Sequence, residues 1–81
     1  CSWHYHKIKD EVFYVRTGKL EVTFGYDKDI TKAKKVILEP GDNFYVETGL
    51  IHQMKGLEDT EMFEFSTQHF DSDSIRVIPG D

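Results

Sequence analysis

The alternation of apolar and polar side chains at every second position restricts the fold of this sequence more than any other feature. Residues 19–24 place Leu20, Val22 and Phe24 on one face of an extended chain and polar residues on the other. No segment keeps helical apolar spacing over the roughly ten residues that a helix needs. Further short strands are expected at residues 11–16, 35–38, 43–46, 51–55 and 61–67. The pattern predicts an all-β domain, with about six or seven antiparallel strands in a sandwich or small barrel.

The segments between these strands are turns and loops. Residues 17–18, 39–42 and 47–50 each contain a glycine and are typical of tight turns. Residues 25–34 are polar and are interpreted as a long hairpin loop. We expect the tail, residues 71–81, to lie along the sheet or against a neighbouring molecule.

Chain length and cysteine content limit how such a domain is stabilised. We expect the 81 residues to form a single domain, 1–81, and a chain of this size buries only about 60–65% of its unfolded surface on folding. Domains this small usually rely on disulfides, a metal ion or a partner subunit. Because Cys1 is the single cysteine, an internal disulfide is excluded, and a metal or a partner is expected.

The charge balance argues against a nucleic-acid partner. Ten Lys and Arg residues face fifteen Asp and Glu residues, the net charge is −5, and the one dense basic stretch is residues 32–35. The longest apolar run, residues 12–15, is far too short to cross a membrane. The chain begins at Cys1 without a signal peptide, so we expect a cytoplasmic domain that lacks its natural N-terminal residues.

The strand at residues 11–16 is apolar on both faces. If Glu11, Phe13 and Val15 point inward, Val12 and Tyr14 point outward, because side chains alternate along a strand. An outward apolar pair normally needs a cover, and a second subunit is the simplest one. Dimerisation would also mask exposed sheet edges. We therefore expect a homodimer.

Chemistry is expected at three histidines and one glutamate. His4 and His6 are two residues apart, so on a strand both imidazoles leave the same face. Glu11 opens the next strand and His52 follows the turn around Gly49, so both can approach that pair if the strands are neighbours. Three imidazoles and a carboxylate suit a divalent manganese, iron, cobalt, nickel or zinc ion with positions open for water or substrate. Taken singly, each residue is more commonly a surface or core residue.

The spacing of these residues resembles the two sequence motifs of the cupin superfamily. The first motif is matched by His4-Tyr-His6, four residues, Glu11, six residues and Gly18. The second is matched by Gly41, five residues, Glu47-Thr-Gly49, two residues and His52. Glu47 stands where the family has proline, and Gly56 stands where it has asparagine, so the sequence departs at a turn and a strand end. The resemblance implies a jelly-roll barrel, also called a double-stranded β-helix, with His4, His6, Glu11 and His52 as metal ligands.

Residues 9–19 also resemble the sugar-handling, mannose-6-phosphate isomerase-like cupins. This resemblance implies an enzyme, an isomerase or epimerase acting on a small molecule such as a sugar or sugar phosphate. The metal would polarise a carbonyl and its neighbouring hydroxyl while a base moves a proton. Glu11 and Glu64 are the candidate catalytic residues, although the alternation with Phe63 and Phe65 predicts that Glu64 faces outward unless strand register turns it inward.

Two other function classes remain open at this point. A cupin dioxygenase would hold Fe(II) or a similar metal with the same ligands, and oxygen consumption would distinguish it. A non-catalytic module would bind a metal or sugar without turnover, which the small number of candidate acids and bases allows. His69 matches no motif and is interpreted as a loop residue. Trp3 is expected to pack in the core rather than stack on a sugar.

Overall fold

The computed structural model describes residues 3–7, 9–67 and 74–78 and is built almost entirely of β-strands. The strands are β1 (Trp3–His6), β2 (Glu11–Thr17), β3 (Leu20–Gly25), β4 (Lys34–Leu38), β5 (Asn43–Val46), β6 (Ile51–Gly56), β7 (Glu61–Ser66) and β8 (Ser74–Ile78). The all-β prediction is confirmed, but the strand count was too low, because β8 forms within the tail. In the described part of the chain, no helix is long and apolar enough to cross a membrane.

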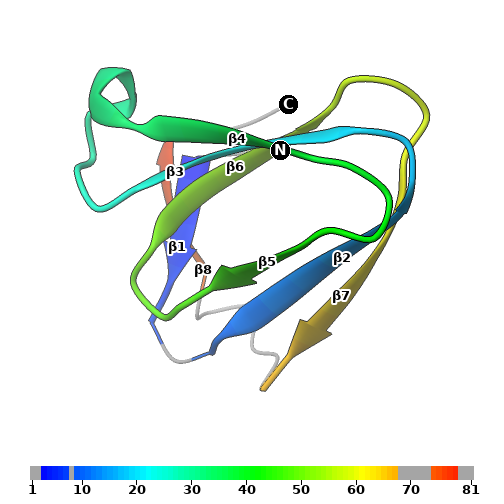
Figure 1. The fold of residues 1–81 in the computed structure, drawn as a ribbon. Helices are drawn as coiled ribbons and strands as arrows, with labels where there is room; N and C mark the ends of the chain where they lie inside the picture. The colour runs from blue at the N-terminus through cyan, green and yellow to red at the C-terminus, as the bar shows by residue number, and fades with distance from the viewer. Residues whose placement is uncertain (1–2, 8, 68–73, 79–81) are drawn as a thin grey trace.

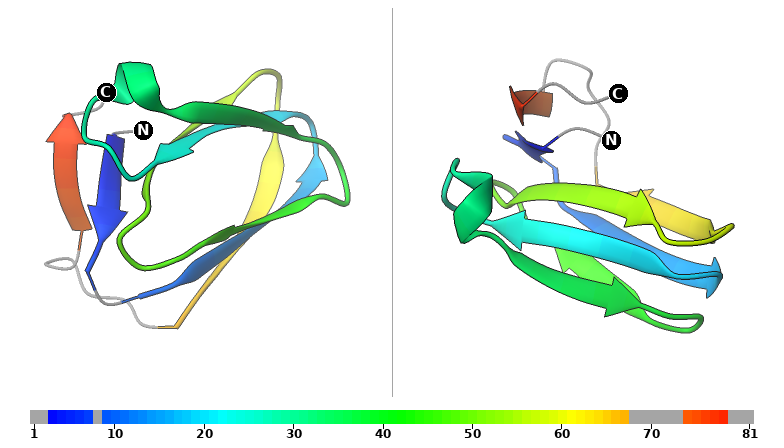
Figure 2. Two further views of the ribbon diagram at one scale, coloured as in Figure 1. Left: turned by 60° about the vertical axis from the view of Figure 1, so that its left-hand side comes forward. Right: turned by 90° about the horizontal axis from the view of Figure 1, so that it is seen from above.

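Two antiparallel sheets face one another and enclose the core (Figure 1). The larger sheet has the order β4-β3-β6-β1-β8, and the smaller has the order β5-β2-β7. The tail prediction is confirmed for residues 74–78, since β8 pairs antiparallel with β1 at one side of the barrel (Figure 2). This arrangement is the jelly-roll barrel that the motifs implied.

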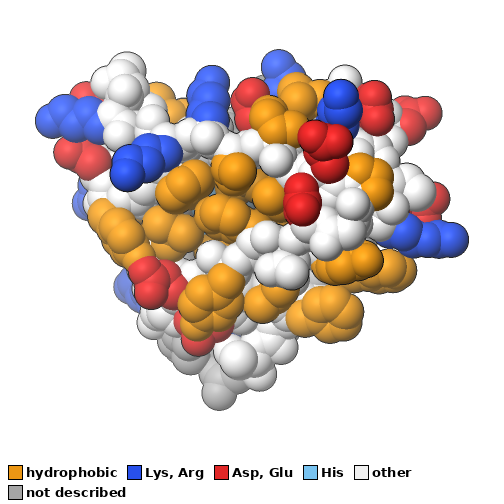
Figure 3. Space-filling model, viewed as in Figure 1, with side chains coloured by type: hydrophobic (Ala, Val, Ile, Leu, Met, Phe, Trp, Pro, Cys, Tyr) orange, Lys and Arg blue, Asp and Glu red, His pale blue; other side chains and the backbone are white. Residues whose placement is uncertain are grey.

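The inward faces of the strands fill the barrel with apolar side chains. The predicted alternation in β3 is confirmed for Leu20 and Val22, which are buried. Each fully buried side chain of this kind contributes about 1.5–3 kcal/mol to stability. Hydrophobic side chains also reach the surface between β4 and β5, which are edge strands of the two different sheets (Figure 3). The buried residues form two clusters, Val15, Leu20, Val22 and Leu38 in one and Phe13, Val46 and Leu50 in the other.

The loop between β3 and β4 packs against the N-terminal strand. Within the segment predicted as a plain loop, Ile30–Lys32 form a short 3-10 turn, and the Asp29 side chain accepts a hydrogen bond from the backbone N–H of Thr31. The indole Nε1–H of Trp3 donates to the carbonyl of Lys28 at 3.1 Å, and Trp3 is fully buried. The prediction that Trp3 is a packing residue is therefore confirmed.

Candidate metal centre

Three histidines from two neighbouring strands meet inside the barrel. β1 pairs antiparallel with β6, which sets His4 directly opposite His52, and His6 lies on the same face of β1 as His4. The ring centroids are 4.3 Å apart for His4 and His52 and 5.1 Å apart for His4 and His6. One ring nitrogen of each histidine lies within 4.8 Å of the others. Two nitrogens bonded to one ion lie at most about 4.2 Å apart, so small side-chain rotations suffice to bring all three onto a single ion.

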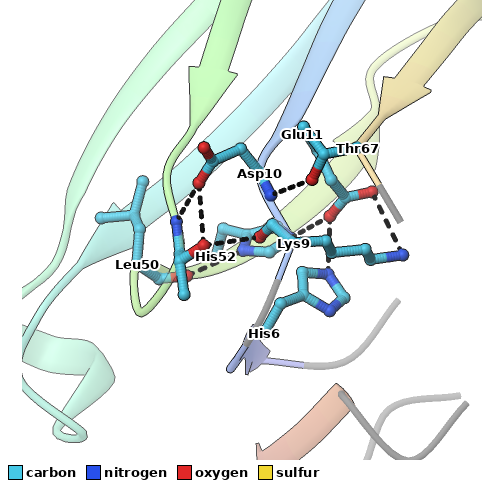
Figure 4. A network of polar contacts seen from close by, with 8 residues as sticks. His6, Lys9, Asp10, Glu11, Leu50, His52 and Thr67 are labelled. Carbon is cyan, nitrogen blue, oxygen red and sulfur yellow. Dashed lines mark hydrogen bonds and ion pairs between the residues drawn. The ribbon is translucent and has the colours of Figure 1, made fainter. Parts of the chain in front are cut away.

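Glu11, at the start of β2 in the opposite sheet, lies against this cluster. Its side chain is almost completely buried, and its Oε1 is 2.6 Å from Nε2 of His6 and 3.8 Å from Nε2 of His52. Figure 4 shows the Glu11 carboxylate between His6 and the neighbouring Lys9 side chain. The fold thus brings together all four residues that the sequence nominated as ligands, and the site spans both sheets.

His52 has the orientation that a metal-binding imidazole needs. Its Nδ1 lies 3.0 Å from the carbonyl oxygen of Leu50, which assigns the ring proton to Nδ1 and leaves the Nε2 lone pair toward the cluster. The buried Nε2 of His52 has no hydrogen-bond partner among the described residues. Burial lowers the pKa of His52 to about 4, so the ring is neutral at pH 7. A bound ion would satisfy this otherwise orphaned buried atom.

Glu64 on β7 lies on the inner side of the smaller sheet, beside Glu11. The β2–β7 pairing sets Glu64 opposite Phe13, so it shares the inward face with Phe13 and Glu11. A hydrogen bond with Glu11, together with burial, raises the pKa of Glu64 to about 7, although its side chain still reaches solvent. Phe63 and Phe65 instead point outward and are 50% and 62% exposed. The outward orientation predicted for Glu64 is therefore wrong, because the two phenylalanines occupy the outer face of β7.

Lys9 is a charged component of the site that sequence reasoning missed. It precedes β2, is 6% exposed, and places its Nζ 3.9 Å from Oε2 of Glu11. In the sequence, only its position two residues before Glu11 suggests that both side chains point to the same side. That alternation is weak evidence for a residue outside a regular strand. His69, interpreted from sequence as a loop residue, lies outside the described residues.

The turn before β6 is fastened to the segment that joins β1 and β2. The backbone N–H and the hydroxyl of Thr48 donate to Oδ1 of Asp10 at 2.7 and 2.8 Å. The backbone N–H of Gly49 donates to the carbonyl of His6 at 2.9 Å. Hydrogen bonds from Tyr45 and Thr48 lower the pKa of Asp10, so this acceptor is ionised at neutral pH. These contacts fix the positions of the two sequence motifs, and hence of their nominated ligands, relative to one another.

Known protein structures resemble this chain in fold. Capsular polysaccharide assembling protein CapF from Staphylococcus aureus matches 98% of the chain with a TM-score of 0.80 and 22% identity. CapF from the same organism in space group C2221 matches 94% with a TM-score of 0.78 and 22% identity. CapF with the inhibitor 3-isopropenyl-tropolone gives the same coverage, TM-score and identity. The present chain spans only 23–24% of the length of these proteins, and the low identity supports a likeness of fold alone.

Sequence comparison identifies the family. No curated protein matches the chain. The family model described as "Cupin domain" matches residues 1–66, which include both motifs, all four nominated ligands and Glu64. Together with the two-sheet jelly-roll barrel and the histidine cluster inside it, this match shows that the chain belongs to the cupin domain family.

Proposed function

We propose that this cupin domain holds a divalent metal ion with His4, His6, Glu11 and His52 and acts as an isomerase or epimerase on a small α-hydroxycarbonyl compound, such as a sugar or sugar phosphate. The observation that carries the proposal is the convergence of three imidazole nitrogens within 4.8 Å beside the buried Glu11 carboxylate. The buried Nε2 of His52, which has no hydrogen-bond partner in the described structure, supports an ion at this point.

The donor set fits a first-row divalent ion. Three neutral imidazoles and one carboxylate suit manganese, iron, cobalt, nickel or zinc, and four protein ligands leave positions open on a six-coordinate ion. A bound ion would supply Lewis-acid polarisation of a carbonyl and the hydroxyl next to it. The hydrogen bond from Nδ1 of His52 to Leu50 keeps that imidazole in the tautomer and orientation for ligation.

Glu64 is the residue to which we assign proton transfer. Its carboxyl lies on the inner face of β7, is hydrogen-bonded to Glu11 and reaches solvent, so it borders the nominated ligand set and is accessible from outside. In an isomerisation it would take the proton from the hydroxyl-bearing carbon and return it to the neighbouring carbonyl carbon, while the hydroxyl proton passes to the former carbonyl oxygen. Glu11 serves as a ligand, and Lys9 adds a positive charge beside these two carboxyl groups.

The inhibitor in one of the CapF structures guides the choice of compounds. A tropolone carries a carbonyl and a hydroxyl on adjacent carbons, as an α-hydroxycarbonyl sugar does. CapF shares this fold at 22% identity and is a much longer protein, so the likeness supports the fold alone, and the α-hydroxycarbonyl class is our proposal for this chain. Ketoses, aldoses and their phosphates are therefore the first panel to assay.

The decisive experiment follows the exchange of carbon-bound protons in heavy water, by NMR, with metal-loaded protein and this sugar panel. We expect deuterium to enter the carbon next to the carbonyl. Glu64→Gln should reduce the rate by about 100-fold or more without loss of metal. Glu61→Gln, on the same strand, should keep the wild-type rate because Glu61 points outward and pairs with Arg16 on the surface.

Three other results would contradict the proposal. Oxygen uptake in place of exchange would indicate a dioxygenase. Tight retention of a sugar with neither exchange nor oxygen uptake would indicate a binding module. Equal rates for wild type and Glu64→Gln would remove Glu64 from the chemistry.

A further inference from the structure

The outer face of the larger sheet carries a pocket of about 740 Å³, a size typical of small-molecule sites. Along β3, Val22 is buried in the core, so the alternating Glu21 and Thr23 lie on the outer face. The right-hand view of Figure 2 looks onto this face of β4, β3 and β6, with the 3-10 turn at one end. We call this site the outer pocket, and its polar lining consists of Glu21, Thr23, Thr31, Lys35, Gln53 and Lys55.

Cross-strand register gathers these polar side chains around β3. Glu21 lies opposite Lys55 on β6, and Thr23 lies between Lys35 on β4 and Gln53 on β6. Thr23 is only 6% exposed although it lies on the outer face, so it forms the floor of the outer pocket. Neighbouring strands are about 4.8 Å apart, so the two long lysine side chains can reach one anionic group above β3 from opposite sides.

The loop between β3 and β4 forms an ordered wall of the outer pocket. The backbone N–H and the hydroxyl of Thr31 donate to Oδ1 of Asp29 at 3.0 and 2.7 Å. The backbone N–H of Asp29 in turn donates to Oδ1 of Asp27 at 2.9 Å, and the carbonyl of Lys28 accepts the hydrogen bond from Trp3. A wall that is ordered before binding lowers the entropic cost of holding a ligand.

The charge of the lining favours an anion, in contrast to the chain as a whole. The outer pocket has two lysines and one glutamate, whereas the whole chain has a net charge of −5. Lys35 lies 3.9 Å from Glu21, and its side chain is 64% exposed. So loose a surface pair contributes little to stability, and Lys35 can turn toward a ligand at small cost. Lys55 forms no ion pair with any residue that the structure describes.

We propose that the outer pocket binds a small organic anion that carries several hydroxyl groups, such as a sugar acid or a sugar phosphate. Lys35 and Lys55 bind its carboxylate or phosphate group. The Glu21 carboxylate and the Gln53 amide, on either side of the anion, hydrogen-bond to its hydroxyl groups. The proposal is independent of the candidate metal centre, because Gln53 and His52 are adjacent on β6 and therefore face opposite sides of the sheet.

Calorimetric titration of the protein as purified, with four probes, tests this specificity. Glucuronate and glucose 6-phosphate carry both an anion and hydroxyl groups, glucose lacks the anion, and cyclohexanecarboxylate lacks the hydroxyl groups. We expect the tighter of the first two probes to bind with a Kd below about 1 mM, and the last two to bind at least about 10-fold more weakly. Whether glucuronate or glucose 6-phosphate is the tighter identifies the anionic group as a carboxylate or a phosphate.

Three substitutions of one kind then locate the bound anion. Lys35→Gln and Lys55→Gln should each raise the Kd of the tighter probe about 5-fold or more. Lys34→Gln is the matched control, because it removes the same charge from β4, but Lys34 lies opposite Phe24 and outside the lining of the outer pocket. This control should keep the wild-type Kd, and circular dichroism establishes that each variant is folded.

Four results would overturn the proposal. Neither anion might bind at concentrations up to about 10 mM, or glucose could bind as tightly as the anions. An equal loss of affinity in Lys34→Gln and Lys55→Gln would indicate attraction by overall charge rather than a site. Removal of bound metal with a chelator should leave the Kd unchanged, so a loss of binding in the chelated, folded protein would place the anion at the metal centre instead.

Discussion

At the scale of single residues, His52 uses its two ring nitrogens for different purposes. Nδ1 contacts the carbonyl of Leu50, while Nε2 faces His4, His6 and Glu11 from a position that is 1% exposed. The backbone contact prevents the ring from flipping, because the flipped ring would lose that hydrogen bond and bury a second unsatisfied nitrogen. His52 is therefore the ligand whose replacement tests the metal site most directly.

His52→Ala should abolish stoichiometric metal binding. Removing one of four ligands strongly lowers the affinity for the metal. His52 is also the single nominated ligand on β6, so no other nominated residue on that strand can replace it. Elemental analysis of protein purified without chelator or a nickel column measures the bound metal. His69→Ala is the matched control, since His69 lies outside both motifs and should keep the wild-type metal content. Full metal content in His52→Ala would contradict the assignment.

The pH dependence of stability in the metal-free chain should also depend on His52. Burial lowers the folded-state pKa to about 4 from 6.5, so between these values the unfolded chain binds a proton that the folded chain does not. The contribution of His52 to the free energy of unfolding is therefore fully present above pH 6.5 and should fall by up to about 3 kcal/mol as the pH drops to about 4. Urea unfolding across this range measures the change.

Glu64 acts in the opposite direction and must be removed for a clean measurement. Its pKa is raised to about 7 from 4.5, so the folded chain takes up a proton first and gains stability as the pH falls through that range. The comparison is therefore made in a Glu64→Gln background, with and without His52→Gln. If both proteins show the same pH slope, His52 is not the cause.

At the scale of elements, one turn is much more restrictive than the others. Gly18, between β2 and β3, has φ +88°, and Gly41 and Gly49 also have positive φ. A Cβ at Gly18 would meet the backbone of the β6–β7 turn, lying 2.7 Å from Cα of Thr60, whereas one at Gly41 would meet nothing within 4 Å. Gly18 is thus required both by its φ angle and by the packing of two turns.

Gly18→Ala should destabilise the domain by about 3 kcal/mol or more, which combines left-handed backbone strain with overpacking. Gly41→Ala shares the strain without the close contact and should destabilise it by only about 1–2 kcal/mol. Urea unfolding of the two variants gives the difference. Equal destabilisation would mean that the Gly18 turn moves freely away from Thr60.

At the scale of the whole molecule, the candidate metal centre connects the two sheets. His4, His6 and His52 lie in the larger sheet and Glu11 lies in the smaller one. An ion bound by all four would cross-link the sheets of a domain that has a small core and no internal disulfide. Metal binding is therefore expected to act on global stability.

Metal loading should raise the melting temperature of the wild type by about 10–20 °C when the free metal is about 100-fold above its Kd. The shift follows because the ion binds the folded chain, and a chelator should reverse it. Thermal unfolding with and without metal provides the measurement, and His52→Ala should show little shift. A melting temperature that is the same in the chelated and loaded wild type would contradict a stabilising site.

The sequence by itself determined the strand alternation, the glycine turns and the four nominated ligands. Side-chain alternation is a local property of an extended chain, and the motif spacing follows the chain directly. The same reasoning predicted an outward Val12 and Tyr14, as the cross-strand register of β2 bears out. It undercounted the strands because β8 is recognisable as a strand only through its pairing with β1.

Only the tertiary structure decided which side of β7 is inside. The alternation of Phe63, Glu64 and Phe65 is equally regular in either orientation, and the more apolar side is the one that local reasoning assigns to the core. The pairing of Glu64 with Phe13 on β2 reverses that choice and brings Glu64 to Glu11. The burial of Lys9 was equally inaccessible from the sequence. The inward side of β7 and the burial of Lys9 both depend on contacts between segments that are far apart in the chain. The residue pattern of one strand does not determine its register with a neighbouring strand.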